Sequence, residues 1–283
     1  MKFLPSAQLI RKAFQGGYAV PSICVWNSEM MDTVLRVASK LQAPVILMHG
    51  PAELRLLAPA KMAATARAIA QSYDVPAALH LDHGDTMDWA TQCLAADYTS
   101  LMLDYSHQPF AENVAALREL VRLARPRGIT VEAELGAVGR ADNNTEEGGL
   151  VSVLTDPAQA AEFVKETGVD ILAVSIGNAH GLYARLPQLD FALLEKLRAA
   201  TNIPLVLHGG SGTPEADLKK VIALGIAKVN VASELVHVIW QTFEDTWKAG
   251  QYRWLPRMVL EAMEAMTPVL EKWFHLCGAV GKA

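Results

Sequence analysis

Residues 76–84 read PAALHLDHG, a short apolar run that opens on proline and ends in polar residues. Proline in this place closes the preceding connection and opens a strand, because it cannot donate to a sheet but is tolerated at a strand's first residue. The same punctuation precedes two more apolar runs, which start at Pro44 and Pro204. The pattern therefore predicts a strand at Pro76–His80, with polar groups at its far end.

Short runs of this kind recur along the chain and alternate with segments of helical periodicity. The predicted strands are Tyr18–Ser22, Pro44–Met48, Pro76–His80, Ser100–Asp104, Thr130–Leu135, Ile171–Ile176, Pro204–His208 and Lys228–Val231. The predicted helices are Ser28–Leu41, Ala60–Tyr73, Met87–Ala96, Phe110–Arg125, Pro157–Thr167, Asp190–Ala200, Glu215–Leu224 and Ser233–Lys248.

Strands that alternate with helices favour a parallel sheet with crossover helices, and eight strands are the number that closes a barrel. We expect an α/β fold, a single (β/α)8 TIM barrel over residues 1–283. The tail, Pro256–Cys277, predicts an extra C-terminal helix beyond the eighth unit. A doubly wound open sheet is the alternative.

The composition fits a large buried core and excludes several classes of protein. Hydrophobic residues make up 51% of the 283 residues and charged residues 19%, which argues against disorder. The net charge of −5 argues against nucleic acid as a partner, because sequence-independent binding needs a basic face. The cysteines, Cys24, Cys93 and Cys277, are widely spaced, and no run of about 18 apolar residues exists to span a membrane. We expect a cytoplasmic protein without a disulfide framework or a membrane partner.

One connection is too long for a simple crossover. Residues 136–154 carry four glycines and the polar tract Asp142-Asn143-Asn144-Thr145-Glu146-Glu147. A connection this long in a compact barrel usually serves as an active-site loop or lid. We predict that this segment covers a site.

Three predicted strand ends carry a histidine followed by glycine: His83, His180 and His208. Active sites of barrel enzymes lie at the carboxyl ends of the strands, so these side chains can converge. Three imidazoles with one open position form a standard catalytic zinc set. A lone histidine at a strand end is usually structural, but three at three ends favour the zinc site. His80 should point away from the side of the strand that carries Leu81, and we expect it to be structural or to support a ligand.

Carboxylates and glycines complete the predicted site. Asp82 directly precedes His83, where a carboxylate suits a general acid or base, or orients the histidine. Asp104 and Glu134 suit the orienting role or an alternative metal position. Residues 209–212 read GGSG and precede a predicted helix, so their backbone N–H groups can bind a phosphate. Residues 230–233 lead into the next helix and would complete the same pocket.

Five motifs stand out together at the strand ends. They are Asp82-His83-Gly84, Glu132-Ala133-Glu134-Leu135-Gly136, Gly177-Asn178-Ala179-His180-Gly181-Leu182-Tyr183, His208-Gly209-Gly210-Ser211-Gly212 and Lys228-Val229-Asn230-Val231-Ala232. The set closely resembles the class II, zinc-dependent fructose-bisphosphate and tagatose-bisphosphate aldolases. The resemblance implies cleavage of a phosphorylated ketose to dihydroxyacetone phosphate and an aldehyde. It also implies Zn2+ on His83, His180 and His208, with Asp82 exchanging the C4 hydroxyl proton.

The resemblance assigns further residues to the substrate, a phosphorylated sugar. The dihydroxyacetone phosphate half would lie against Gly181, Gly209, Gly210, Ser211, Asn230, Val231, Ala232 and Ser233. The family also binds a monovalent cation, Na+ or K+, near that phosphate. Its second acid/base group is a glutamate on the long loop; the matching position here is Asp142, with Glu146 or Glu147 as alternatives. Arg253 matches an arginine that reaches the distal phosphate, often across a dimer, and we expect a homodimer or homotetramer.

Departures from the family pattern concentrate where the aldehyde would bind. Cys24 replaces an asparagine that helps to hold substrate, and residues 50–52 read GPA where the family has Ser or Thr, Pro and Gly. Ala232 resembles the tagatose branch. We therefore expect a ketose 1-phosphate or 1,6-bisphosphate of tagatose or fructose type, with an altered aldehyde half.

Three other functions compete with the zinc aldolase. A zinc hydrolase on a barrel commonly has His-x-His on its first strand, and Tyr18–Val25 contains no histidine. A Schiff-base aldolase needs a strand lysine that faces the barrel, and neither Ile171–Ile176 nor Leu205–His208 has one. A non-catalytic stabilising subunit of a tagatose-bisphosphate aldolase would be marked by lost ligands, and all three histidines are present.

Overall fold

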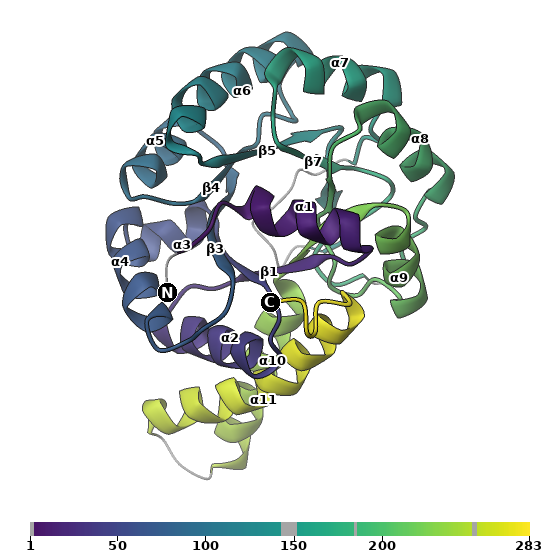
Figure 1. Ribbon diagram of the computed structural model, residues 1–283. Helices are drawn as coiled ribbons and strands as arrows, with labels where there is room; N and C mark the ends of the chain where they lie inside the picture. Colours follow the sequence, from purple (N-terminus) through teal and green to yellow (C-terminus); the bar gives the residue numbers. More distant parts are fainter. Residues whose placement is uncertain (1–2, 143–151, 184–185, 251–253) are drawn as a thin grey trace.

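Eight parallel strands form a closed barrel in the computed structural model, which describes residues 3–142, 152–183, 186–250 and 254–283 (Figure 1). In order around the barrel they are β1 (Val20–Cys24), β2 (Val45–His49), β3 (Ala77–Gly84), β4 (Ser100–Leu103), β5 (Thr130–Leu135), β7 (Ile171–Val174), β9 (Leu205–Leu207) and β10 (Ile226–Val231). β10 pairs back to β1, with Lys228 opposite Val20, and this pairing closes the barrel. The predicted (β/α)8 barrel is confirmed, and the open-sheet alternative is wrong.

Helices that follow the strands cover the outside of the barrel (Figure 1). They are α2 (Ser28–Lys40), α4 (Pro59–Ala70), α5 (Met87–Ala95), α6 (Phe110–Ala124), α7 (Pro157–Thr167), α8 (Phe191–Thr201), α9 (Glu215–Ala223) and α10 (Ser233–Ala249). In α2, Met31, Leu35 and Ala38 recur at helical spacing and are buried, while the Asn27 side chain accepts the N–H of Met30. Burial of this stripe against the barrel supplies most of the stability of such a helix.

Two helices were not predicted. α1 (Ser6–Gly16) lies across one end of the barrel (Figure 1), where the hydroxyls of Ser6 and Ser100 lie 2.7 Å apart. The backbone N–H of Ala7 also donates to the Thr130 hydroxyl at 2.9 Å. The other is the short α3 (Pro51–Leu56), which follows β2 at the opposite end of the strands. α1 thus covers one end of the barrel, whereas α3 lies beside the opposite end.

The predicted extra helix is α11 (Leu255–Leu276), which packs against α10 and α2. Its inner face buries Met266, Leu270 and Trp273. The α10–α11 pair extends beyond the barrel wall (Figure 1). Within the described ranges, no helix is long and apolar enough to cross a membrane.

Polar side chains fill part of the barrel interior. β3 extends to Gly84 rather than ending at His80 as predicted, and all eight of its residues are buried. Alternate residues of a strand share a face, so β3 directs His80 and Asp82 to one side and β5 does the same with Glu132 and Glu134. These two strands therefore bring a buried cluster of titratable groups to the carboxyl end of the barrel.

Candidate active site

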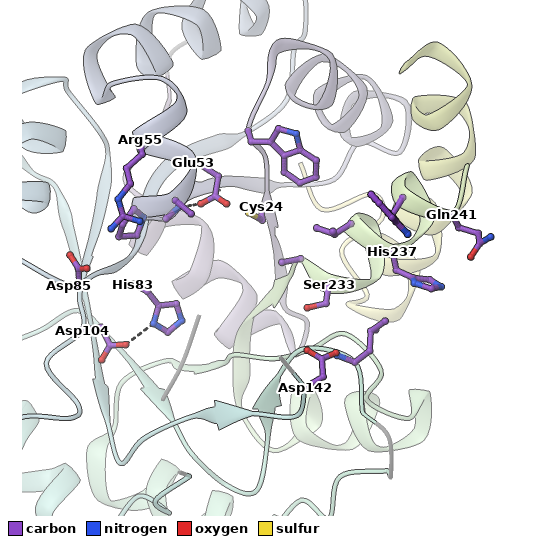
Figure 2. Close-up of a pocket in the computed structure, with 18 of the residues that line it drawn as sticks. Cys24, Glu53, Arg55, His83, Asp85, Asp104, Asp142, Ser233, His237 and Gln241 are labelled. Carbon is purple, nitrogen blue, oxygen red and sulfur yellow. Dashed lines mark hydrogen bonds and ion pairs between the residues drawn. The ribbon is translucent and has the colours of Figure 1, made fainter. Parts of the chain in front are cut away.

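A cavity of about 900 Å³ opens at the carboxyl ends of the strands (Figure 2). Its lining includes His83, Asp104, Asp142, Ala232 and Ser233. This is the end of the barrel where the sequence predicts the site. The long loop begins on the same rim, because β6 (Gly139–Arg140) pairs with β8 (Ala179–His180) in parallel.

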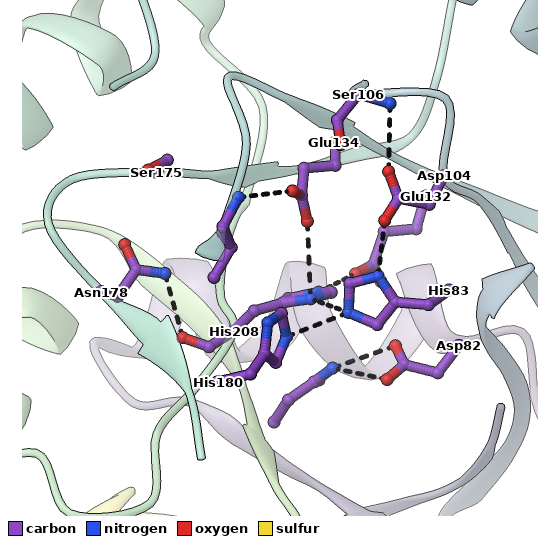
Figure 3. A network of polar contacts seen from close by, with 12 residues as sticks. Asp82, His83, Asp104, Ser106, Glu132, Glu134, Ser175, Asn178, His180 and His208 are labelled. Carbon is purple, nitrogen blue, oxygen red and sulfur yellow. Dashed lines mark hydrogen bonds and ion pairs between the residues drawn. The ribbon is translucent and has the colours of Figure 1, made fainter. Parts of the chain in front are cut away.

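The three predicted histidines converge beside this cavity (Figure 3). Nε2 of His83 lies 2.7 Å from Nδ1 of His208 and 3.1 Å from Nε2 of His180. All three side chains are buried. His83 has a left-handed backbone with φ of 43°, which is uncommon outside glycine and concentrates at functional sites. Strand ends that are far apart in the chain thus direct three ring nitrogens to one point.

Carboxylates hold two of these rings from behind. Oδ2 of Asp104 lies 2.7 Å from Nδ1 of His83, and Oε1 of Glu132 lies 3.0 Å from Nε2 of His208. A carboxylate on the outer nitrogen fixes the tautomer of the ring and leaves the inner nitrogen as a metal ligand. This contact would let Asp104 orient His83, and the predicted orienting role stays a prediction. Glu132, which was not among the predicted site residues, would do the same for His208.

The donor set fits a divalent ion. Zinc with Zn–N distances of about 2.0–2.1 Å in tetrahedral geometry separates its ligand nitrogens by roughly 3.3 Å. The separations of 2.7 and 3.1 Å around His83 are shorter than that value by about 0.6 and 0.2 Å. Three imidazoles held by buried carboxylates are also the ligand chemistry that zinc accepts. The triad could therefore hold such an ion with small movements of the rings.

Asp82 lies beside the triad and is clamped by an amide. The side-chain N–H2 of Asn230 donates to both carboxylate oxygens of Asp82, at 3.0 Å each. Burial alone would raise the pKa of Asp82, but the charge of His83, the hydrogen bond of His80 and the charge of Lys228 together hold that pKa well below its usual range. Asp82 is thus an ionised, oriented carboxylate at neutral pH.

Glu134 occupies the other side of the triad. Its Oε1 accepts the backbone N–H of Val138 at 2.9 Å, while its Oε2 lies 3.7 Å from Nδ1 of His208. Burial and the nearby charge of Asp104 raise the pKa of Glu134 to about 8. Glu134 also forms, with His83 and Asp104, a second group able to hold a metal. Both roles predicted for Glu134, orienting group and alternative metal position, are geometrically open to it.

A buried lysine inside the barrel was missed by the sequence analysis. Nζ of Lys228 on β10 lies 2.9 Å from both carboxylate oxygens of Glu132, 3.9 Å from Asp82 and 3.5 Å from Nε2 of His80. His80 also contacts the Ser100 hydroxyl at 2.8 Å through Nδ1. His80, Asp82 and Glu132 could themselves bind a metal, but the ammonium group already supplies a cation there. β7 and β9 have no lysine, whereas β10 carries Lys228 inside the barrel.

Glycines allow two ligand-bearing segments to touch. A Cβ on Gly209, whose φ is 64°, would collide with the carbonyl oxygen of Ala179, next to His180. The predicted phosphate-binding turn is partly occupied by internal contacts: Gly210 donates its N–H to the Asn230 carbonyl at 3.1 Å, and the Ser211 hydroxyl accepts the N–H of Glu234 at 3.1 Å. The turn is therefore rigid and braced against α10.

The predicted loop carboxylate, Asp142, lines the cavity next to Gly181, the residue that follows His180. Asp142 accepts the backbone N–H of Leu182 at 2.9 Å, and a Cβ on Gly181 would lie 2.6 Å from its Oδ1. Val231 is buried in β10, whereas Ala232 and Ser233 line the cavity. Three other predicted site residues, Glu146, Glu147 and Arg253, lie outside the described residues.

Comparisons with known proteins agree with this geometry. The family model for class-II fructose-bisphosphate aldolase matches residues 5–282. The YdjI aldolase of Escherichia coli K12 is 34% identical, with all of both chains covered and a TM-score of 0.88. A putative fructose-1,6-bisphosphate aldolase of Coccidioides immitis is 31% identical, covering 100% of this chain and 99% of that one, with a TM-score of 0.89. Fructose-bisphosphate aldolase of Campylobacter jejuni, 22% identical over 99% and 97% of the two chains, shares the fold at a TM-score of 0.85.

A match over nearly the whole chain, two relatives above 30% identity and a convergent histidine triad all point to the same kind of lyase. The chain belongs to the class II fructose-bisphosphate aldolase family.

Proposed function

We propose that this aldolase uses zinc to cleave the C3–C4 bond of a ketose 1-phosphate or 1,6-bisphosphate, reversibly, to dihydroxyacetone phosphate and an aldehyde. The observation that carries the proposal is the meeting of three ring nitrogens, 2.7 and 3.1 Å apart, beside the clamped carboxylate of Asp82. The ion would sit on His83, His180 and His208. When bound, it would polarise the ketose carbonyl and stabilise negative charge that develops on cleavage.

The protein's own groups then manage the protons. Asp82 is held ionised, so it can accept the C4 hydroxyl proton as the carbon–carbon bond breaks and return it in condensation. Asn230 fixes the direction of that carboxylate through two hydrogen bonds. Asp142, on the rim beside Gly181, would exchange the proton at C1 of dihydroxyacetone phosphate. Asp82 on β3 and Asp142 on the loop after β6 would thus take separate proton transfers.

The dihydroxyacetone phosphate half would lie over the braced glycine turn. Gly209, Gly210 and Ser211 face the start of α10, where Ala232 and Ser233 line the cavity. The N-terminus of α10 offers the positive end of a 17-residue helix to an anion at this place. A monovalent cation, Na+ or K+, near the phosphate is part of the proposal.

The test is a retro-aldol assay on the zinc-loaded enzyme. Fructose 1,6-bisphosphate, tagatose 1,6-bisphosphate and several ketose 1-phosphates are compared by kcat/KM, with dihydroxyacetone phosphate measured as product. Asp82→Asn should remove cleavage while the metal content per chain stays unchanged, because Asp82 is not a ligand. Failure to release dihydroxyacetone phosphate from every ketose tested, by protein with full metal content, would contradict the proposal.

A further inference from the structure

Two segments at the carboxyl end of the barrel interlock, and each carries one histidine of the triad. Residues 177–183 follow β7 and hold His180, while residues 208–213 follow β9 and hold His208. β7 and β9 are neighbours in the barrel. The second segment also contains the glycine turn that would bind the phosphate. A change in the spacing of the two segments would therefore move His180 relative to both His208 and the turn.

Asn178 makes the first link between the two segments. Its side-chain N–H2 donates to the backbone carbonyl of His208 at 3.0 Å (Figure 3), and its Oδ1 accepts the backbone N–H of Ile176 at 2.9 Å. Asn178 is only 1% exposed. Both ends of the amide thus have partners inside the protein, which fixes the start of one segment against the start of the other.

Tyr183 makes the second link through its hydroxyl group. The hydroxyl accepts the backbone N–H of Ala179 at 2.7 Å, and it donates toward the carbonyl oxygens of Ala179, at 2.8 Å, and Gly209, at 3.3 Å. The ring packs on the turn, since a Cβ on Gly212 would lie 3.0 Å from Cδ2 of Tyr183. One side chain thus contacts the residue before His180 and both outer glycines of the turn.

This hydroxyl completes the support of the turn. On the α10 side, the Ser211 hydroxyl accepts the N–H of Glu234 at 3.1 Å, and Tyr183 acts on the side of His180. Burial raises the pKa of Tyr183, so its hydroxyl keeps its proton and can donate at neutral pH. Phenylalanine at position 183 would keep the ring on the turn, but it would remove every one of these hydroxyl contacts.

We infer that Tyr183 is a positioning residue whose hydroxyl couples the metal site to the phosphate-binding turn. The inference rests on the proposed aldolase function, and it adds a link between binding of the metal and binding of dihydroxyacetone phosphate. Tyr183 acts through the backbone of Ala179 and Gly209. Loss of its hydroxyl should therefore weaken both binding events and leave the reaction of bound substrate nearly unchanged.

The experiment compares Tyr183→Phe with wild type in two separate measurements. The first is the zinc dissociation constant of the metal-free protein, titrated against a competing chelator without substrate. The second is condensation of dihydroxyacetone phosphate with the aldehyde that the wild type accepts best, at saturating zinc, resolved into kcat and the KM for dihydroxyacetone phosphate. The matched control is Tyr73→Phe. Tyr73 is also half-buried, and its hydroxyl donates to Asp32 at 2.6 Å, but it does not line the cavity.

Tyr183→Phe should raise both the zinc dissociation constant and the KM for dihydroxyacetone phosphate by about 3- to 10-fold, the contribution of one hydrogen bond, with kcat within about threefold of wild type. Tyr73→Phe should change each constant by less than about twofold, because its lost hydrogen bond lies away from the site. A rise in only one of the two constants would overturn the coupling, since Tyr183 would then support one segment alone. No rise in either, or a larger fall in kcat, would overturn the positioning role.

The zinc measurement needs no substrate, so it separates this inference from the proposed function. If zinc-loaded wild-type protein neither condenses dihydroxyacetone phosphate with an aldehyde nor exchanges its C1 proton, the aldolase proposal fails. The dissociation constant of inorganic phosphate, measured by calorimetry on the zinc-loaded protein, then replaces KM as the measure of the turn. If the wild type is active and Tyr183→Phe binds zinc and dihydroxyacetone phosphate as tightly as wild type, only the inference about Tyr183 fails.

Discussion

Replacing Lys228 by methionine should destabilise the fold strongly at neutral pH. Lys228 and Glu132 are both fully buried, and Nζ lies 2.9 Å from each carboxylate oxygen. Breaking a buried pair by removing one partner typically costs about 3–5 kcal/mol, because the other charge stays buried without compensation. Methionine keeps most of the volume of lysine, so the loss of charge dominates the change.

A second route to the magnitude gives a similar value. The charges of Lys228, His80 and His208 now outweigh burial and hold the pKa of Glu132 at about 2. Without Lys228, the buried carboxylate of Glu132 can become neutral by binding a proton, which removes the cost of burying a charge. Each pH unit above an ordinary pKa of about 4.5 then costs about 1.36 kcal/mol, or roughly 3.4 kcal/mol at pH 7. The loss in free energy of unfolding caused by Lys228→Met should therefore be smaller at pH 5, because protonating Glu132 costs less free energy there.

The assay is urea unfolding of the metal-free protein at pH 7 and pH 5. Lys219→Met, on the exposed side of α9, serves as the control and should change the free energy of unfolding by less than about 0.5 kcal/mol. Lys228→Met combined with Glu132→Gln should recover at least half of the loss, because glutamine carries no charge and still accepts the hydrogen bond of His208. A Lys228→Met defect below about 1 kcal/mol at pH 7, or a double variant no more stable than the single one, would refute the reasoning.

Three further predictions concern the site directly. Alanine in place of any one of the three triad histidines should lower the metal content per chain and reduce retro-aldol kcat/KM by at least about 100-fold, and turnover that survives exhaustive chelation would contradict this. Asp142→Ala should slow exchange of the C1 proton of dihydroxyacetone phosphate, followed by NMR, with metal content unchanged; normal exchange would move the role to another loop carboxylate. In the metal-free protein, the pKa of Glu134 is raised from 4.5 to about 8, so the folded state keeps a proton that the unfolded state releases. Stability from this group therefore falls as pH rises from about 4.5 to about 8, and Glu134→Gln should flatten that fall in urea titrations; an unchanged slope would show that Glu134 is ionised in the fold.

The barrel was predictable because its pattern is repetitive. Each strand is a short apolar run, each helix carries an apolar stripe, and punctuation such as Pro76 recurs. The bounds shift where polar residues continue a strand: β3 runs to Gly84 because Asp82 and His83 are buried at its end. In a sequence pattern, a polar residue after an apolar run indicates that the strand ends there. At the carboxyl end of a barrel, however, polar residues can be buried and still belong to the strand. α3 escaped notice because six residues are too few to show a period.

The convergence of the triad histidines was also predictable, because the fold brings all strand ends to one rim. The charged groups that contact these histidines from inside the barrel were harder to predict from the sequence. Glu132 precedes Glu134 by two residues, the spacing of one strand face, and that signal could have identified it as a support for His208. Lys228 offered a weaker signal, a lysine in a strand whose only other polar residue is Asn230. Its partner Glu132 is 96 residues away in the chain, and such pairings emerge only from the three-dimensional closure of the barrel.

The separation between the histidine triad and α3, which lines the cavity, has an evolutionary consequence. The triad is carried by the barrel strand β3, by β8 of the small β6–β8 sheet and by the residue that follows barrel strand β9, whereas α3 is a short helix inserted between β2 and α4. Changes in length or sequence of that insertion can alter the acceptor that is recognised without moving a metal ligand. Lineages of this fold can therefore diversify in the sugars they process while bond cleavage is conserved. Laboratory evolution toward new sugars should begin with libraries in α3.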